Sequence, residues 1–483
     1  MITKNIENVL ISGAISDLSA LYRDKKLTVI EAVTWYLSRI ESISQTGLAI
    51  NAVREVSACA LEDARLADVA ISTGQTLGPL HGIPVLLKDN ILTGDGMSAA
   101  AGAAALKNFH PKIDATLVQK LRFAGAIILG KTNLTEFADF VSDVMPSGYS
   151  GNGGVVKNPH GIEYGRGQGS SVGSAAAVAA SLCMFAIGSE TQNSIQTPAS
   201  YSSVVGYKPT VGVVSRFGVV PLVPSQDSPG PLTRSVADAI LVASVLAGSD
   251  MRDSISLSVQ GVMPGSVRCE SLKGVRVGVL RRQIADRPEF SDLMPLFEST
   301  LQKISHAGAC IIDPCDLPSA EQLQEVRSSV FRTEFKAALN TFLIEHDSPC
   351  GIGSMSDLIT WNESHPEHIP YGQSLLIAAN ATTGLDNADY IKDRLRDIAL
   401  TRTSGIDAAL SMYDVDVLIA PMGAAAKLTG KSGAPVVAIP CGVTSTGIPF
   451  GITVISEFGS DARLLAIAEQ IEAVIGDRRP VLS

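Results

Sequence analysis

Short apolar runs alternate with helical segments along the chain, and this alternation limits the fold more than any other feature. Residues 85–87 are continuously apolar, which is typical of a buried strand. A helical pattern over 114–121 ends at Gly125, and another apolar run over 126–129 follows it. A second helix and strand are predicted over 174–188. The alternation therefore predicts an α/β fold.

The second half of the chain returns to the sheet after a long helical stretch. Strand-like runs lie at residues 275–280, 415–420, 436–439 and 452–455. Between about 250 and 400 the chain carries more charge and several helical patterns, so we predict a helix-rich cover there. A chain of 483 residues exceeds the usual size of one core. Because it has no internal repeat and no linker rich in proline and serine, we still predict a single domain over 1–483.

Charge and apolar patterning restrict the partners and the location. The net charge of −10 is spread without basic clusters, which argues against nucleic acid and anionic membrane as partners. The N-terminus lacks the apolar core of a signal peptide, and the longest apolar run, 175–188, is too short to span a bilayer. No CxxC pair occurs, and a proline separates His365 from His368. We expect a cytoplasmic protein with a small-molecule partner and without metal or cofactor.

Two catalytic patterns occur but fit their surroundings poorly. GAIILGKT at 125–132 matches a phosphate-binding loop, yet its residues 126–129 look like a buried strand rather than a loop with exposed N–H groups. GSSVG at 169–173 matches the nucleophile turn of α/β-hydrolases and would make Ser171 the nucleophile. The residues before it are polar and rich in glycine, not strand-like. We disfavour both interpretations.

Three polar residues lie at the ends of predicted elements, where their side chains can enter a shared cleft. Lys88 follows the apolar run, Ser170 lies in a glycine-rich loop, and Ser194 follows the predicted strand over 184–188. Taken singly, each has an ordinary explanation, because Lys88 can pair with Asp89 and serines are common in flexible turns. The residues alone favour the ordinary explanation.

Ordered blocks around these three residues resemble the amidase signature family. The blocks are GPLHGIPVLLKDN (78–90), GKTNLTEFADF (130–140), GVVKNPH (154–160), GQGSSVGSAAAVAAS (167–181), GSETQNSIQTPAS (188–200), VVGYKPTVGVVSRFGVVP (204–221), SQDSPGPLTRSVADA (225–239) and GAPVVAIPCGVTSTGIPFGITVI (433–455). Their order and spacing match that family over most of the chain except its middle. The resemblance implies one large mixed central sheet flanked by helical layers, and a Ser-cisSer-Lys triad.

The resemblance also assigns roles to individual residues. Ser194 matches the nucleophile, Ser170 the bridging serine with a cis peptide, and Lys88 the base, with Ser171 and Glu190 in supporting positions. The backbone N–H groups expected to face the developing oxyanion belong to Thr191, Gln192, Asn193 and Ser194. To act as a base near neutral pH, Lys88 needs a pKa far below the usual value of about 10.4, which burial would provide.

Several positions depart from the family pattern. Gln192 and Asn193 stand where glycines are common, and Gln196 stands where an arginine is common. Val172 replaces a glycine of the serine loop, which comprises residues 164–174. Asn tolerates left-handed backbone, but we expect Gln192 to add bulk at the mouth of the site. The missing arginine is expected to leave Glu190 without its partner. Because the three triad residues are intact, we expect activity with an altered pocket.

The predicted function is hydrolysis of a small carboxamide or peptide-like amide through an acyl-enzyme on Ser194. One alternative is acyl transfer, or amide formation, with an amine in place of water. Another is a non-catalytic or partner-dependent subunit. Trp361 and Tyr371 in the cover are candidates to line the pocket. The sequence also leaves room for a homodimer.

Overall fold

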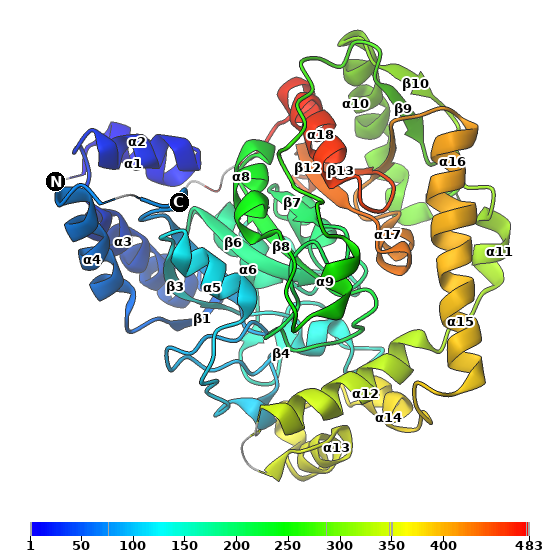
Figure 1. Cartoon of the computed structure of the whole chain (residues 1–483), viewed down its shortest axis with the longest axis horizontal. Coiled ribbons are helices and arrows are strands. Elements are labelled where there is room, and N and C mark those ends of the chain that lie inside the picture. Colours follow the sequence, from blue (N-terminus) through cyan, green and yellow to red (C-terminus); the bar gives the residue numbers. More distant parts are fainter. Residues whose placement is uncertain are drawn as a thin grey trace.

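An eleven-stranded mixed sheet forms the centre of the molecule (Figure 1). The computed structural model describes residues 2–75, 77–285, 287–346, 348, 351–479 and 481. In spatial order the strands are β1, β3, β2, β6, β8, β7, β12, β13, β11, β9 and β10. The trio β3, β2 and β6 is parallel, as is the trio β11, β9 and β10, and the other neighbours are antiparallel. The predicted mixed sheet is therefore confirmed.

Seven strands of the sheet, β2, β3, β6, β9, β11, β12 and β13, agree with the predicted apolar runs, whereas β1, β7, β8 and β10 were not predicted. The strands of the sheet are β1 (Val53–Val56), β2 (Pro84–Lys88), β3 (Ile127–Thr132), β6 (Phe185–Glu190), β7 (Val205–Lys208), β8 (Ser228–Thr233), β9 (Arg276–Val279), β10 (Cys310–Ile312), β11 (Val417–Pro421), β12 (Val436–Val443) and β13 (Pro449–Ile455), with a separate hairpin of β4 (Tyr149–Ser150) and β5 (Gly154–Val155). Every residue of β3 is buried in the sheet. The segment that matched a phosphate-binding loop is therefore a core strand.

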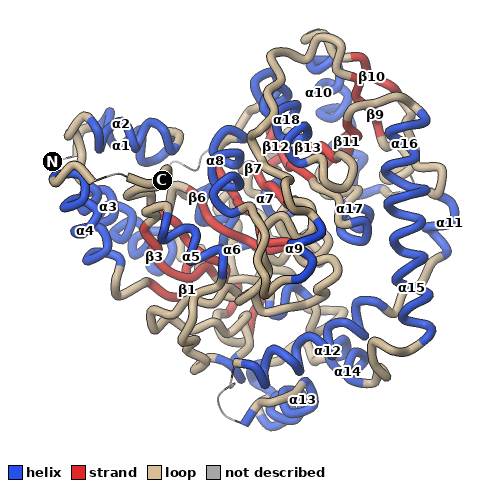
Figure 2. Tube along the Cα trace, in the orientation of Figure 1, coloured by secondary structure: helices blue, strands red, loops and turns tan. Residues whose placement is uncertain are grey.

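Helices surround the sheet (Figure 2). The α-helices are α1 (Lys4–Ser12), α2 (Ile15–Arg23), α3 (Val29–Arg39), α4 (Ala60–Ser72), α5 (Thr116–Phe123), α6 (Val172–Ala179), α7 (Gln196–Tyr201), α8 (Val236–Leu246), α9 (Ser254–Ser258), α10 (Met294–His306), α11 (Ala320–Glu325), α12 (Val330–Glu345), α13 (Met355–Ser364), α14 (Ser374–Asn380), α15 (Ala388–Ile398), α16 (Asp407–Met412), α17 (Ala426–Ser432) and α18 (Asp461–Ile475). Shorter 3₁₀ or π-helical turns are η1 (Ile40–Thr46), η2 (Ala104–Leu106), η3 (Glu136–Asp139), η4 (Pro288–Leu293), η6 (Pro366–His368) and η7 (Ala399–Ile406).

Helices cover both faces of the sheet. Successive residues of β7 face opposite sides. On one side the Tyr207 hydroxyl contacts Asp461 at the start of α18, and on the other Gly206 packs against Ala199 of α7. Helix α6 packs on β6 with every residue buried, and its run of alanines and other small side chains allows a close approach. This packing holds the loop before α6 against the end of the sheet.

The region predicted to be a cover divides into two parts. Residues 276–312 carry β9 and β10, which extend the edge of the main sheet. Helices α12, α13 and α14 lie apart from the sheet, at the lower edge of Figure 1. Helix α12 packs on the segment after β3 through aromatic pairs, including Phe137 with Phe335, whose ring centroids lie 5.8 Å apart. An apolar cluster thus joins the cover to the main body.

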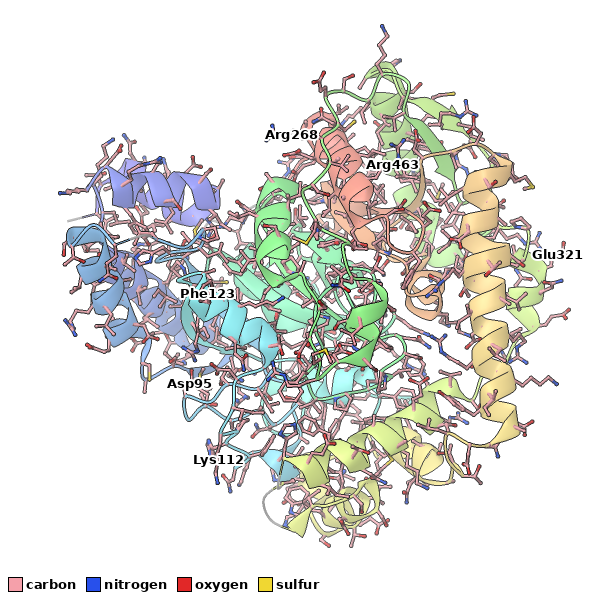
Figure 3. All side chains as sticks on the ribbon, viewed as in Figure 1. Asp95, Lys112, Phe123, Arg268, Glu321 and Arg463 are labelled. Atoms are coloured by element: carbon pink, nitrogen blue, oxygen red, sulfur yellow. The ribbon has the colours of Figure 1, made fainter. Side chains whose placement is uncertain are left out.

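Charged side chains project from the outer surface (Figure 3). Arg463 and Glu321 are examples, with 56% and 84% of their side chains exposed. None of the helices formed by the described residues has the length and apolar character needed to cross a membrane. Free thiols are found at six cysteines, and Cys350 lies outside the described residues.

Replacing Gly173 would test the packing that holds the serine loop. A Cβ at this position would overlap the carbonyl oxygen of Asn133 and lie 2.7 Å from that of Ala52. Because backbone atoms cannot move aside cheaply, we expect Gly173→Ala to lower the free energy of unfolding by about 1–3 kcal/mol. Thermal or denaturant unfolding would measure the change. The control is Gly353→Ala, where the nearest atom would be 3.7 Å away. Equal stability of both variants would contradict the prediction.

Candidate active site

The carboxyl ends of three parallel strands meet at one point of the sheet. Lys88 ends β2, Ser189 lies near the end of β6, and the chain leaving β3 continues to Thr135. Polar residues that follow parallel strands in this way converge at one edge. The predicted serine loop reaches the same edge, since the Thr135 N–H donates to the Ser170 carbonyl oxygen at 3.1 Å.

Lys88 is fully buried, with no exposed surface. Its Nζ lies 2.7 Å from the Ser170 Oγ, 3.0 Å from the Ser189 carbonyl oxygen and 3.1 Å from the Ser189 Oγ. Burial lowers the pKa of Lys88 to about 7, although the carboxyl groups of Asp227, Glu190 and Asp139 act in the opposite direction. The pairing with Asp89 that ordinary packing would suggest does not occur, because Asp89 bonds to Arg54.

The serine loop carries the cis peptide that the resemblance implies, between Gly169 and Ser170. Ser171 donates its backbone N–H to the Ser194 carbonyl oxygen at 3.0 Å, which joins the loop to the segment after β6. The Ser171 Oγ donates to the Ser189 carbonyl oxygen at 3.0 Å and accepts from the Ser189 N–H at 3.3 Å. The Ser171 hydroxyl is therefore committed to β6.

Ser194 is buried, with 2% of its surface exposed, and it follows the turn formed by Thr191, Gln192 and Asn193. Within the described chain, nothing accepts a hydrogen bond from the N–H groups of Gln192, Asn193 or Ser194. Neither Gln192 nor Asn193 has a positive φ. The backbone of this turn is therefore not left-handed, and the tolerance of asparagine for left-handed backbone, which we expected to matter at Asn193, is not needed.

The side chains of Gln192 and Asn193 tie this turn to its neighbours. The Gln192 Nε2 donates to the Gln226 Oε1 at 3.3 Å, and the Asn193 Nδ2 donates to the Gly167 carbonyl oxygen in the serine loop. The Gln192 side chain also passes close to Gly430, where a Cβ would lie 2.6 Å from the Gln192 Cγ. The bulk of Gln192 is therefore accommodated against α17.

Glu190 keeps a partner despite the missing arginine, so the expectation that it loses one was wrong. Its Oε2 accepts the N–H groups of Ile195 and Gln196 at 2.6 and 2.9 Å. The Gln196 Nε2 donates to the other oxygen, Oε1, at 2.5 Å. Burial raises the pKa of Glu190, while Lys208 and these hydrogen bonds oppose that rise. An uncharged amide can thus satisfy this carboxyl group.

No sequence pattern singled out Ser189 or Asn90, although both lie in the quoted blocks. The Asn90 Nδ2 donates to the Ser189 Oγ at 2.9 Å, so Ser189 connects Asn90 with Lys88. Both residues line a cavity of about 180 Å³. Its other walls include Ala138, Thr191, Val220 and Asp227. The cavity therefore lies beside Ser189, whereas Lys88, Ser170 and Ser194 are not among its lining residues.

The aromatic candidates of the cover are not among the residues that line this cavity. Trp361 stacks on His365, with ring centroids 4.0 Å apart, and Tyr371 packs edge-on against Tyr149 at 5.0 Å. His365 and His368 both stack on the Trp361 ring. Within the described ranges, no group of three or more histidine, cysteine, aspartate or glutamate residues could hold a metal ion.

A family model described as Amidase matches residues 31–432. The chain belongs to the amidase family. It is therefore an enzyme of the class that hydrolyses amide C–N bonds. The amidase is 33% identical to a probable amidase of Arabidopsis thaliana over 97% of this chain and 91% of that protein.

A solved structure supports the same assignment. The peptide amidase of Stenotrophomonas maltophilia is 37% identical and superposes with a TM-score of 0.89, covering 97% of this chain and 98% of that chain. The amidase is also 31% identical to a glutamyl-tRNA(Gln) amidotransferase subunit of Synechococcus over 92% of each chain. Relatives of this amidase therefore include both an amidase for peptides and a subunit of a larger enzyme.

Replacing Lys88 tests the effect of burying its amine. The pKa is about 7 in the folded protein and near 10.4 in an unfolded chain, so the cost of burial is full below pH 7 and fades as pH rises towards 10.4. We expect Lys88→Met to raise the unfolding midpoint at pH 7 by about 2 °C or more, with a smaller gain near pH 9.5.

Differential scanning calorimetry at the two pH values would measure both shifts. The control is Lys107→Met, which alters an exposed lysine and should leave the midpoint unchanged at either pH. A Lys88→Met protein that is less stable than the wild type at both values would mean that the lost hydrogen bonds outweigh the cost of burial.

Proposed function

We propose that this amidase hydrolyses a small carboxamide or peptide-like amide through an acyl-enzyme on Ser194. Ser170 would be the bridging serine and Lys88 the base. The single observation that carries the proposal is the 2.7 Å contact between the Lys88 Nζ and the Ser170 Oγ, made by a lysine with no exposed surface. A hydroxyl needs such an adjacent base to become a nucleophile at neutral pH.

The contacts of Lys88 suit an uncharged amine. Such an amine has two hydrogens and one lone pair. The two hydrogens can be donated to the carbonyl oxygen and Oγ of Ser189, which leaves the lone pair for the Ser170 hydroxyl. A pKa of about 7 keeps a large fraction of Lys88 in this form at neutral pH.

In the acylation step, Lys88 takes the Ser170 proton while Ser170 takes the proton of Ser194. The Ser194 Oγ bonds to the carbonyl carbon, and the carbonyl oxygen becomes an oxyanion. When the C–N bond breaks, Ser170 gives its proton to the departing amine and recovers one from Lys88. Water then repeats the sequence on the ester, which releases the acid and restores Ser194.

The turn before Ser194 would stabilise the oxyanion. The N–H groups of Gln192, Asn193 and Ser194 have no acceptor within the described chain, so they are available to a ligand. Together with Thr191 they are the predicted oxyanion donors. Donors held in place before the reaction cost no reorganisation when charge develops. The side-chain bonds of Gln192 and Asn193 to Gln226 and Gly167 support such a fixed turn.

Replacing Ser194 tests the nucleophile. We expect Ser194→Ala to lose about 10³-fold or more of the amide hydrolysis rate and all labelling by a fluorophosphonate, because no acyl-enzyme can form. Ser171→Ala is the matched control, since the Ser171 hydroxyl is bonded to Ser189. Peptide mass spectrometry would locate the label. A label that survives Ser194→Ala and disappears with Ser171→Ala would refute the assignment.

Two alternative functions are compatible with the family: acyl transfer, which differs from hydrolysis only in its last step, and activity that needs a partner. An amine could replace water, or the chain could act only within a larger enzyme, as the amidotransferase relatives suggest. We favour independent hydrolysis because the chain is more similar to the peptide amidase than to the amidotransferase subunit of Thermotoga maritima. The identity is 37% and the TM-score 0.89 for the former, against 24% and 0.68 for the latter.

Product analysis separates these outcomes. We expect purified protein to release acid and ammonia or amine from peptide amides, anilides or primary amides, with the same products when amines are added. New amides formed with added amines would favour acyl transfer. No turnover and no serine label with any substrate would favour the partner-dependent subunit.

A further inference from the structure

The segment after β3 has an unusual backbone beside the site. Phe137, Ala138 and Asp139 all have positive φ, at 42°, 55° and 75°. Side-chain-bearing residues rarely adopt this conformation, and three in succession persist only where the surroundings hold them. Phe137 is held by the cover through Phe335, and Ala138 lines the cavity beside Ser189. The strained turn therefore presents Asp139 close to the site.

Asp139 is connected to the serine loop through Ser147. The Ser147 Oγ donates to the Asp139 Oδ2 at 3.1 Å. The same oxygen accepts the N–H of Gln168 at 3.0 Å and that of Gly169 at 2.9 Å. These two amides come directly before Ser170 in the chain. A continuous series of contacts therefore runs from Asp139 to the residue that touches Lys88.

The Ser147 hydroxyl has one hydrogen and two lone pairs. Because the N–H groups of Gln168 and Gly169 occupy both lone pairs, its hydrogen needs an acceptor, and the Asp139 carboxyl group supplies one. Without that acceptor the hydroxyl could turn and give up one of the two amides. Asp139 therefore fixes the orientation in which Ser147 holds the serine loop.

Two cations act on Asp139, namely Lys88 at the end of β2 and Arg166 in the serine loop. Burial raises the pKa of Asp139 to about 6, although both cations and the Ser147 hydrogen bond oppose this rise. The carboxyl group is thus largely ionised at neutral pH. In that form it favours the charged form of Lys88, as Asp227 and Glu190 also do.

We propose that Asp139 and Ser147 are positioning residues of this active site: Ser147 holds the two amides before Ser170, and Asp139 both fixes Ser147 and adjusts the charge on Lys88. The proposal rests on the proposed function, because it needs Lys88 as the base. It adds a second ionisable group, contributed by the segment on which the cover packs.

Asp139→Asn separates the charge from the hydrogen bond. Its amide oxygen can still accept from Ser147, so the loop should stay in place while the negative charge disappears. Lys88 then loses its proton more readily, and we expect the acid limb of the kcat/KM profile to move to lower pH by about half a pH unit. The control is Asp143→Asn, an exposed acid four residues away, which should leave the limb unchanged.

Ser147→Ala removes the hydroxyl and keeps the charge. We expect kcat to fall about tenfold or more with KM within about twofold, because the loop before Ser170 loses its anchor while substrate contacts remain. The acid limb should stay at the wild-type pH. A merely structural role would instead lower the unfolding midpoint of both variants without a limb shift or a selective loss of kcat, and that result would overturn the proposal.

The Ser194→Ala and Lys88→Met variants distinguish a failure of this proposal from a failure of the proposed amide hydrolysis on which it rests. If both retain amide hydrolysis, the proposed function is wrong, and this proposal falls with it. If both are inactive while Asp139→Asn keeps the wild-type acid limb, only the role of Asp139 is wrong. If Asp139→Asn does not fold, an unaltered kcat in Ser147→Ala would by itself overturn the proposal.

Discussion

A buried amine that touches serine oxygens instead of a carboxylate is the constraint on which this site depends. Lys88 ends β2 with no exposed surface, and its three hydrogen-bond contacts go to Ser170 and Ser189. Burying an ammonium ion without an ion pair is costly, so the uncharged form gains. The neighbouring parallel strands make this arrangement possible, because β6 supplies Ser189 and the chain leaving β3 holds the serine loop through Thr135.

The side chains of Gln192, Asn193 and Gln196, which depart from the family pattern, each find a hydrogen-bond partner nearby. Where an arginine is common, Gln196 gives Glu190 an amide donor, and the start of α7 adds two backbone N–H groups. Gln192 and Asn193 replace glycines but find partners in Gln226 and Gly167. Amide side chains thus take over from both a charged side chain and flexible glycines. The turn before Ser194 is therefore held on both sides by these side-chain contacts.

The helical cover reaches the site through the segment after β3. Its aromatic side chains pack on Phe137 and Phe140, and the same segment carries Asp139 and continues to Ser147. Because Ser147 holds the amides before Ser170, the packing of the cover and the geometry of the serine loop are mechanically connected. A change in the packing of the cover would therefore alter the geometry of the serine loop without any change to Lys88, Ser170 or Ser194.

Local patterns in the chain were enough to predict the alternation of strands and helices, since short apolar runs such as 85–87 are typical of buried strands. The family blocks also predicted the cis peptide before Ser170, which the structure contains. The catalytic roles of Lys88, Ser170 and Ser194 stay a prediction. Tertiary packing was needed to bring Ser189, Ser147 and Asp139 to the same place and to give Glu190 its partner. These contacts join residues distant in the chain, and local patterns cannot specify which distant side chains will meet when separate strands and the cover pack together.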